Sequence, residues 1–437
     1  MLPGDSGCRV LAHPVGPPLA PMSGCSAGVE HRPHGSVHVS IFWFRRVVWL
    51  AGWLAWTVVL CHIAFFTGLM QRYPILKPLQ PAGDLAVSIF IILSGFVITH
   101  LVLAKAEPYG MYIKRRFLRI FPIYGVALAL GFVTTFLNFH TFLDTPPADV
   151  FPMTEVGRLA VQRHALDGNG LWINLGLHLL MLHGAVSSNV VFESMYAFLR
   201  PAWSLSLEWQ FYLLAPFLIW AAVRKWPSVI LAFVAVAGYT AFALGYLGNF
   251  VLPSFLPGAG LLFAVGIASC LIVGDKKTHA SRIALVVIAA ACLYWYAHDH
   301  TVRLALFIWI MFLTASVLRG RPDSLGRSIA AIYDPLFSAR WITSIGLASY
   351  STYLLHVPIL QLMQWLTVRQ LGLGAVGANA LAVVGTLALT FLLSKITFRW
   401  IETPCINIGK GQYAGTVSTP IEVPAIEAVT LSASQSH

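Results

Sequence analysis

Three ionisable side chains lie inside long apolar stretches of this sequence. They are His62 in VVLCHIAFF, Glu208 in PAWSLSLEWQFYLLAP and His356 in SYSTYLLHVPIL. An ionisable group in a membrane-length apolar stretch is costly to bury, so each of the three is a candidate functional residue. Imidazole and carboxylate groups are also the side chains that most often transfer protons in enzymes. The estimated depth of each residue in its stretch places all three in the outer half of a membrane, where they could share one cavity.

Each of these residues also has a structural interpretation. His62 would then be a buried histidine bonded to a backbone carbonyl group, and Glu208 a structural carboxylate paired with a nearby donor. For His356 we favour the structural interpretation, because Tyr350 and Pro358 indicate a packed and kinked helix.

A basic cluster follows the second apolar stretch. Its members are Lys114, Arg115, Arg116 and Arg119 in the segment KRRFLR. A role in membrane topology is enough to explain such a cluster. The functional alternative is a clamp for a polyanion, because guanidinium groups bind phosphates in a bidentate manner. A cytosolic donor that carries a nucleotide would suit this clamp.

We expect no metal site and no disulfide framework. Histidines are plentiful on the predicted outer side, and His298 and His300 flank Asp299, but no carboxylate cluster at a fixed spacing accompanies them. The 6 cysteines include no CxxC pair. The sequence also contains no nucleotide-binding glycine loop, zinc-protease motif or nucleophile elbow in a credible context.

The composition excludes a soluble enzyme, a disordered regulator and a disulfide-built secreted module. Of the 437 residues, 57% are hydrophobic and only 10% are charged, against roughly a quarter in soluble domains. A soluble domain of this size needs a charged surface, so the apolar stretches must contact a lipid bilayer. The predicted fold class is an all-α integral membrane protein.

Stretches of about 20 apolar residues suffice to span a bilayer, and the sequence contains ten of them. A shorter apolar segment, 171–186, is interrupted by polar residues and is either an interfacial or re-entrant helix or an eleventh span. The ten predicted spans are approximately 47–69, 84–104, 119–139, 203–223, 228–248, 252–274, 282–298, 302–318, 343–366 and 374–398.

The formal net charge of +11 is explained by membrane topology better than by a nucleic-acid partner. Ten spans with a cytoplasmic N-terminus place most basic residues on cytoplasmic segments. We therefore expect a multi-pass protein of the inner (plasma) membrane with both termini in the cytoplasm and no nucleic-acid partner. The basic residues then left outside are Arg72, Lys77, Arg158, Arg163, Arg200, Arg303 and Arg369.

The two ends of the chain differ from its apolar centre. Residues 1–40 mix Pro, Gly, His and Ser without an apolar period and are predicted to be a disordered cytoplasmic leader. Residues 41–408 form the predicted transmembrane domain. Residues 409–437 are polar and are predicted to be a disordered cytoplasmic tail.

Several segments together carry a resemblance to a known family. The sequence resembles the acyltransferase family three of multispanning membrane proteins over about residues 47–408, because six motifs occur in the same order. They are VVLCH ending at His62, AVSIFIILSGFVITH (86–100), KRRFLRIFPIY (114–124), WSLSLEWQFYLLAP (203–216), SYSTYLLHVP (349–358) and FRWIETP (398–404).

The resemblance implies transfer of an acyl group, usually acetyl from acetyl-CoA, to a hydroxyl of a carbohydrate or glycolipid acceptor. His62 falls on the essential histidine of the family, which would act as the general base on the acceptor hydroxyl. Glu208 would orient His62 or bond the acceptor, and Ser94 and Tyr350 would donate hydrogen bonds to the oxyanion. The coenzyme phosphates would be held by Lys114, Arg115, Arg116 and Arg119.

The sequence departs from the family pattern in its first span. The family places an arginine eleven residues before the histidine, often with an acidic residue three positions earlier, whereas this chain has Ala51 and Val48 there. Arg46 lies five residues before Ala51, and its long side chain would partly replace the missing one. The alternative function is therefore a catalytically impaired member that transports a glycan or lipid-linked intermediate. An N-acyltransferase differs from the leading prediction only in its acceptor.

Overall fold

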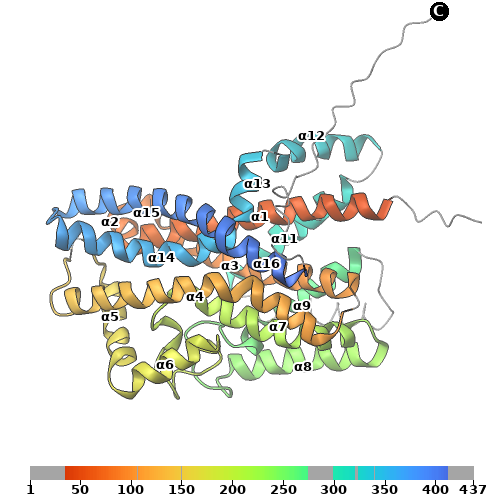
Figure 1. The fold of residues 1–437 in the computed structure, drawn as a ribbon. Coiled ribbons are helices and arrows are strands. Elements are labelled where there is room, and N and C mark those ends of the chain that lie inside the picture. Colours follow the sequence, from red (N-terminus) through yellow and green to blue (C-terminus); the bar gives the residue numbers. More distant parts are fainter. Residues whose placement is uncertain are drawn as a thin grey trace, which may run out of the picture. The chain divides into compact units, whose positions relative to one another are not determined.

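The computed structural model describes residues 35–105, 107–148, 150–273, 299–319, 323–338 and 340–411, with the side chains of a few helical residues undescribed. These residues form helices joined by turns, and they contain no strand. The chain divides into two compact units, Met1–Phe42 and Trp43–His437. The described part of the first unit is the start of helix α1, so everything below concerns the second unit (Figure 1).

Long helices alternate with short helical turns along the chain. The elements are α1 (Gly35–Phe66), α2 (Leu69–Arg72), η1 (Pro74–Leu76), α3 (Leu79–Ala104), α4 (Tyr109–Phe142), α5 (Met153–Leu166), α6 (Asn169–Leu179), η2 (Ser194–Tyr196), η3 (Arg200–Ala202), α7 (Trp203–Ala222), α8 (Lys225–Ala243), α9 (Leu256–Val273), α11 (His300–Leu318), α12 (Ser324–Ser338), α13 (Arg340–Leu347), α14 (Ser349–Trp365), η4 (Leu366–Gln370), α15 (Ala375–Thr397), η5 (Phe398–Glu402) and α16 (Thr403–Gly409).

Within the described residues, 8 helical segments are long and apolar enough to cross a membrane. Each of them overlaps one of the ten predicted spans. The segments are Arg46–Phe66, Pro74–Ala104, Tyr109–Phe142, Arg200–Ala222, Lys225–Ala243, Leu256–Val273, His300–Leu318 and Ala375–Gly409.

The other two predicted spans are not among these segments. The stretch 282–298 lies outside the described residues. The stretch 343–366 contains α14, which has 17 residues. The number ten and the cytoplasmic position of both termini therefore stay predictions.

The segment 171–186 forms only the 11-residue helix α6 before the chain turns. At 1.5 Å per residue this helix is about 16 Å long, so it is too short to be an eleventh span. Helix α1 begins at Gly35, within the predicted leader 1–40. The rest of that leader, and the predicted tail beyond Gly411, lie outside the described residues.

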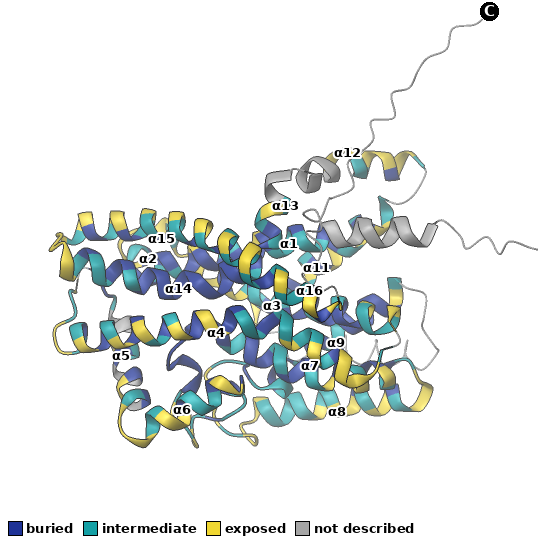
Figure 2. Cartoon of the chain, in the orientation of Figure 1, coloured by how far each residue is buried: buried dark blue, intermediate teal, exposed yellow. Residues whose placement is uncertain are grey.

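Helix α14 is the most deeply buried long helix of the described bundle. It packs against α15 on one side and α4 on the other (Figure 1). It is dark blue along most of its length in Figure 2, whereas α8 is mainly teal and yellow. Because α14 contacts protein rather than lipid, it can carry buried polar residues such as Thr352, His356, Gln361 and Gln364.

Two glycines allow α3 and α9 to approach closely. A Cβ atom on Gly266 would lie 2.1 Å from the Ile92 carbonyl oxygen, and one on Gly95 would lie 2.5 Å from the Phe263 carbonyl oxygen. Both distances are far below van der Waals contact, so only glycine fits at these crossing points. The crossing matters for the site below, because Ser94 and Phe263 both line its cavity.

Two buried histidines stack beside α4. The ring centroids of His178 and His183 are 4.0 Å apart, and both side chains are fully buried. Burial lowers the pKa of His178 to about 4. Burial, together with the neighbouring His178, lowers the pKa of His183 well below its ordinary value. Both rings are therefore held in the neutral form at neutral pH.

We expect Gly266→Ala to destabilise the protein. The added methyl group must push α3 away from α9, and such overpacking typically costs about 1–3 kcal/mol. Gly260→Ala in the same helix is the matched control, because a Cβ atom there meets nothing within 4 Å. Thermal unfolding in detergent should show a lower Tm for Gly266→Ala alone. Equal Tm values for the two variants would contradict the close packing described here.

We also expect the protein to lose stability as the pH falls from 6.5 towards 4. The unfolded chain binds protons on these histidines in that interval and the folded chain does not, so acidification favours unfolding. For His178, a pKa lowered from 6.5 to about 4 corresponds to roughly 3 kcal/mol of stability that acidification removes.

The variant His183→Phe removes one of the two buried proton-binding groups while keeping an aromatic ring in the stack. Thermal unfolding of both proteins at pH 7.5 and pH 5 measures the effect. The Tm of the variant should fall less on acidification than the Tm of the original protein. An identical fall would show that the buried histidines do not control this pH dependence.

Candidate functional site

A cavity of about 240 Å³ lies between α1, α3, α4, α7 and α14, and we call it the central cavity. Most of its lining is apolar, but polar and charged groups project into it from four of these helices. They are Ser94, Arg116, Arg119, Ser204, Glu208, Tyr212, Ser349, Tyr350 and Tyr353.

Glu208 is held in the central cavity by two hydroxyl groups. Ser94 Oγ and Tyr212 OH both donate to its Oε1 atom, at 2.9 and 2.5 Å. Tyr212 lies one turn further along α7, so the helix itself brings these two side chains together. Ser94 contacts Glu208 from α3, next to Gly95, where α3 crosses α9 closely. The predicted site residues Ser94 and Glu208 are therefore in direct contact.

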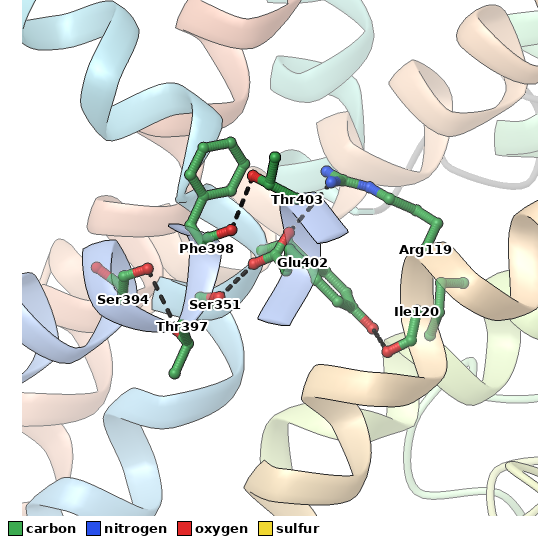
Figure 3. Close-up of polar contacts among 9 residues, drawn as sticks. Arg119, Ile120, Ser351, Ser394, Thr397, Phe398, Glu402 and Thr403 are labelled. Carbon is green, nitrogen blue, oxygen red and sulfur yellow. Dashed lines mark hydrogen bonds and ion pairs between the residues drawn. The ribbon is translucent and has the colours of Figure 1, made fainter. Parts of the chain in front are cut away.

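Arg119 enters the cavity from α4 and forms an ion pair with a buried carboxylate. Its Nη1 atom lies 3.1 Å from Glu402 Oε2, and the Glu402 side chain is fully buried. Ser351 of α14 donates to the other carboxylate oxygen (Figure 3). The π-helical turn Phe398–Glu402 presents this carboxylate towards α4. The pair fixes the position of the Arg119 guanidinium, which also lies 5.8 Å from the centre of the Tyr350 ring.

Glu402 was not among the predicted site residues. It lies in the segment FRWIETP, which supported the family resemblance, but the apolar pattern of the sequence did not single it out. Only the fold shows that this segment returns to the basic cluster of α4.

Arg116 projects into the same cavity without a carboxylate partner. Its guanidinium lies 5.9 Å from the centres of the Tyr112 and Tyr212 rings, which are favourable positions for a cation. Among the described residues no carboxylate lies within salt-bridge distance of Arg116. Its charge is therefore available to an anionic ligand in the central cavity.

The structure divides the predicted phosphate clamp into two parts. Arg116 and Arg119 line the central cavity, but Arg115 and Lys114 do not. Arg115 forms an ion pair with Glu107 and donates to the Gly409 carbonyl oxygen at 3.0 Å. Lys114 is exposed.

The two candidate histidines are in direct contact. His62 Nδ1 and His356 Nε2 are 2.7 Å apart, across the interface between α1 and α14. The sequence favoured a structural role for His356, and this contact shows that it is the immediate neighbour of the candidate base. The sequence placed both histidines, and Glu208 as well, in the outer half of the predicted spans, but it did not indicate which two of the three are in contact. Neither histidine lines the central cavity, whereas Glu208 does, so the three do not share one cavity.

Ser204 and Tyr353 connect the central cavity to the histidine pair. Their hydroxyl oxygens are 2.8 Å apart, and both side chains line the cavity. The Tyr353 ring centre is also 6.0 Å from that of His356, which lies one helical turn further along α14. Tyr353 therefore lines the cavity and is at the same time a neighbour of His356.

The hydroxyl hydrogens of the two predicted oxyanion donors are engaged elsewhere. Tyr350 donates to the Ile120 carbonyl oxygen at 3.0 Å, and Ser94 donates to Glu208. Both residues line the cavity, so their position fits the prediction. To stabilise an oxyanion, each hydroxyl would have to give up its present acceptor and donate to the substrate oxygen instead. The oxyanion role of these two residues stays a prediction.

Ala51, the position where the family places an arginine, also lines the central cavity. Arg46, the predicted replacement, does not line it. Its side chain is buried, and Nη1 donates to the Ser316 carbonyl oxygen of α11 at 3.3 Å. Arg116 and Arg119 are thus the arginines of the described cavity lining.

The described residues contain no group of three or more histidine, cysteine, aspartate or glutamate side chains placed to hold a metal ion. His298, part of the His-Asp-His segment discussed above, lies outside them.

Similarity to known proteins agrees with the six ordered motifs. The chain is similar to the acyltransferase MdmB of Streptomyces mycarofaciens, with 29% identity over 40% of this chain and 38% of that protein. It is also similar to protein 2 of the picA locus of Rhizobium radiobacter, with 37% identity over 18% of this chain and 45% of that protein. The chain thus matches less than half the length of either relative, and no solved structure matches it.

Residues 47–395 match the family described as the acyltransferase domain, which covers most of the chain and contains His62, Glu208 and both cavity arginines. A match of this extent, together with the helical bundle and the ordered motifs, identifies the chain as a member of acyltransferase family three.

Proposed function

We propose that this protein is a membrane O-acyltransferase that moves an acyl group, acetyl from acetyl-CoA, to a hydroxyl of a cell-envelope or exported carbohydrate. The observation that carries the proposal is a pair of contacting histidines, one of which neighbours a tyrosine that lines a cavity with two arginines. The protein would act as a multi-pass component of the inner membrane, with acyl-CoA supplied from the cytoplasm.

The central cavity suits the acyl donor at its arginine-lined end. Coenzyme A carries several phosphate groups, and guanidinium groups bind phosphate more effectively than ammonium groups do. Arg116 has no carboxylate partner to displace among the residues that the structure describes. Arg119 is held in place by Glu402, so a phosphate would bind to a guanidinium that is already oriented. The remaining apolar lining would accept the uncharged part of the donor.

His62 supplies the base that the reaction needs. A neutral hydroxyl is a poor nucleophile, and a general base accelerates its attack by about 10²–10⁴-fold. In the proposed step the acceptor oxygen forms a bond with the thioester carbonyl carbon while its proton passes to the His62 imidazole. The carbon–sulfur bond then breaks, and the coenzyme thiolate leaves and takes up the proton that His62 received, which returns the imidazole to its neutral form. Ser204 and Tyr353, whose hydroxyl oxygens are 2.8 Å apart, lie on the side of the cavity where Tyr353 neighbours His356.

We expect His62→Ala to abolish acyl transfer. Membranes that carry the protein should transfer labelled acetyl from acetyl-CoA to glycan, and the variant should lose at least about 10²-fold in rate. His100→Ala is the matched control, because His100 lies in a candidate span but is exposed. Full transfer by His62→Ala would overturn the proposed mechanism. Glycan translocation by a protein that shows no transfer at all would instead support the transporter alternative.

We expect Arg116→Ala and Lys114→Ala to differ strongly. A charge-assisted hydrogen bond contributes about 1.5–3 kcal/mol, so loss of Arg116 should raise the KM for acyl-CoA about 10- to 100-fold. Lys114 belongs to the same basic cluster but is exposed and outside the cavity, so its variant should keep the original KM. Initial rates measured against acyl-CoA concentration give both values. Equal effects of the two substitutions would exclude the central cavity as the donor site.

A further inference from the structure

We propose that His356 is a positioning residue for His62: its Nε2 atom accepts the hydrogen of His62 Nδ1 and so leaves His62 Nε2 free to take a proton. This inference rests on the proposed role of His62 as the general base. It assigns a specific task to a residue whose position on a packed helix favoured a purely structural role.

The backbone of α14 fixes the hydrogen of His356. The Nδ1 atom of His356 lies 3.2 Å from the carbonyl oxygen of Thr352, one helical turn earlier. A carbonyl oxygen can only accept a hydrogen bond, so Nδ1 of His356 carries a hydrogen. In a neutral imidazole the other nitrogen then has a lone pair and accepts. Nε2 of His356, the atom that faces His62, is therefore the acceptor.

The environment of His356 keeps this ring neutral. Its side chain is fully buried, and no carboxylate of the described residues lies within salt-bridge distance of either histidine. A buried imidazolium without a counter-charge would be strongly disfavoured. The doubly protonated form of His356, which would reverse the direction of the bond, is thereby excluded at neutral pH.

The short contact then determines the tautomer of His62. Two nitrogens that are 2.7 Å apart need one hydrogen between them, because two facing lone pairs would repel each other. Since His356 Nε2 has none, the hydrogen belongs to Nδ1 of His62. The lone pair of His62 is consequently on Nε2, the ring atom on the far side from His356. This is the atom that can remove a proton from an acceptor hydroxyl.

The same contact becomes stronger when His62 takes up a proton. The imidazolium formed on His62 keeps its Nδ1 hydrogen on His356, and a hydrogen bond from a charged donor is roughly twice as strong as a neutral one. The carbonyl oxygen of Thr352 holds His356 in the accepting orientation throughout. A second histidine thus takes the place that a carboxylate occupies in many catalytic triads, without adding a charge to the buried site.

The packing of α1 against α14 holds the two rings in register. Val59, Ile63 and Phe66 of α1 form an apolar cluster with Val357 and Leu360 of α14, next to the two histidines in the sequence.

Phe66 adds two further restraints on this contact. Its ring stacks on His62, with centroids 5.2 Å apart, and its backbone carbonyl oxygen accepts a hydrogen bond from Gln364 Nε2 at 2.9 Å. The two helices therefore cannot slide past each other without breaking a second polar contact.

The test compares His356→Leu with His356→Gln. Leucine removes the acceptor, whereas the amide oxygen of glutamine can take the position of Nε2 and accept from His62. In ¹⁵N-histidine-labelled protein in detergent, the His62 signals are identified by their absence from His62→Ala. They should show a hydrogen on Nδ1 in the original protein and in His356→Gln. In His356→Leu a substantial part of His62 should carry its hydrogen on Nε2.

Acyl-transfer kinetics provide the second measurement. His356→Leu should lower kcat at least tenfold, and by up to about 10⁴-fold, the loss seen when a catalytic histidine is held in the wrong tautomer. The KM values should change less than twofold, because His356 does not line the donor cavity. His356→Gln should recover most of the lost kcat.

The inference is overturned if the His62 tautomer is the same in His356→Leu as in the original protein, or if His356→Gln loses kcat without a change in the His62 signals. If His356→Leu does not fold, His356→Gln still tests the acceptor through the same two measurements. The tautomer measurement needs no turnover, so it is separate from the test of the proposed function. Full acyl transfer by His62→Ala would contradict the proposed function, and this result does not depend on which tautomer His62 adopts in the original protein.

Discussion

The requirement that buried polar groups find partners inside an apolar bundle governs the centre of this protein. Helix α14 carries hydroxyl, amide and imidazole groups at buried positions, and lipid can satisfy none of them. Its neighbours therefore supply the partners: α1 provides His62, α4 packs its basic cluster nearby, and the turn after α15 provides Glu402. The functional site is built from these contacts and from Glu208 of α7.

The site has two parts with different physical character. At the arginine end, charges are paired with charges or aromatic rings, and Arg116 keeps its charge for a ligand. At the histidine end, Thr352, His356 and His62 form a chain of hydrogen bonds. The charge near this chain is again a cation, because the guanidinium carbon of Arg200 lies 5.0 Å from the centre of the Phe66 ring, which stacks on His62. This separation suits a reaction in which a polyanionic donor binds at one place and a neutral hydroxyl is activated at another.

The absence of the family arginine at Ala51 is easier to understand in this arrangement. Ala51 lines the central cavity, so an arginine there would add a third cation beside Arg116 and Arg119. Arg46 does not take over this position, because its guanidinium is bonded to α11. The positive charge of the described cavity lining therefore comes from α4. The contacts of His62 with His356 and Phe66 do not involve position 51.

The sequence alone determined the class of the protein and singled out several residues of the candidate site. Apolar length predicted the helices, and 8 of the ten expected spans are found in the described residues, because a span needs only a run of apolar side chains. The rarity of buried ionisable groups singled out His62, Glu208 and His356, and motif order identified the family.

The sequence could not predict which side chains contact each other, because these contacts depend on which helix faces pack together. Nothing in the order of residues shows that His62 contacts His356 rather than Glu208, or that Glu402 reaches Arg119 across 283 positions of sequence. Nor does the spacing of KRRFLR show that two of its cations line a cavity while the other two do not. The tertiary structure decided these points, because helix packing brings distant side chains within hydrogen-bonding distance.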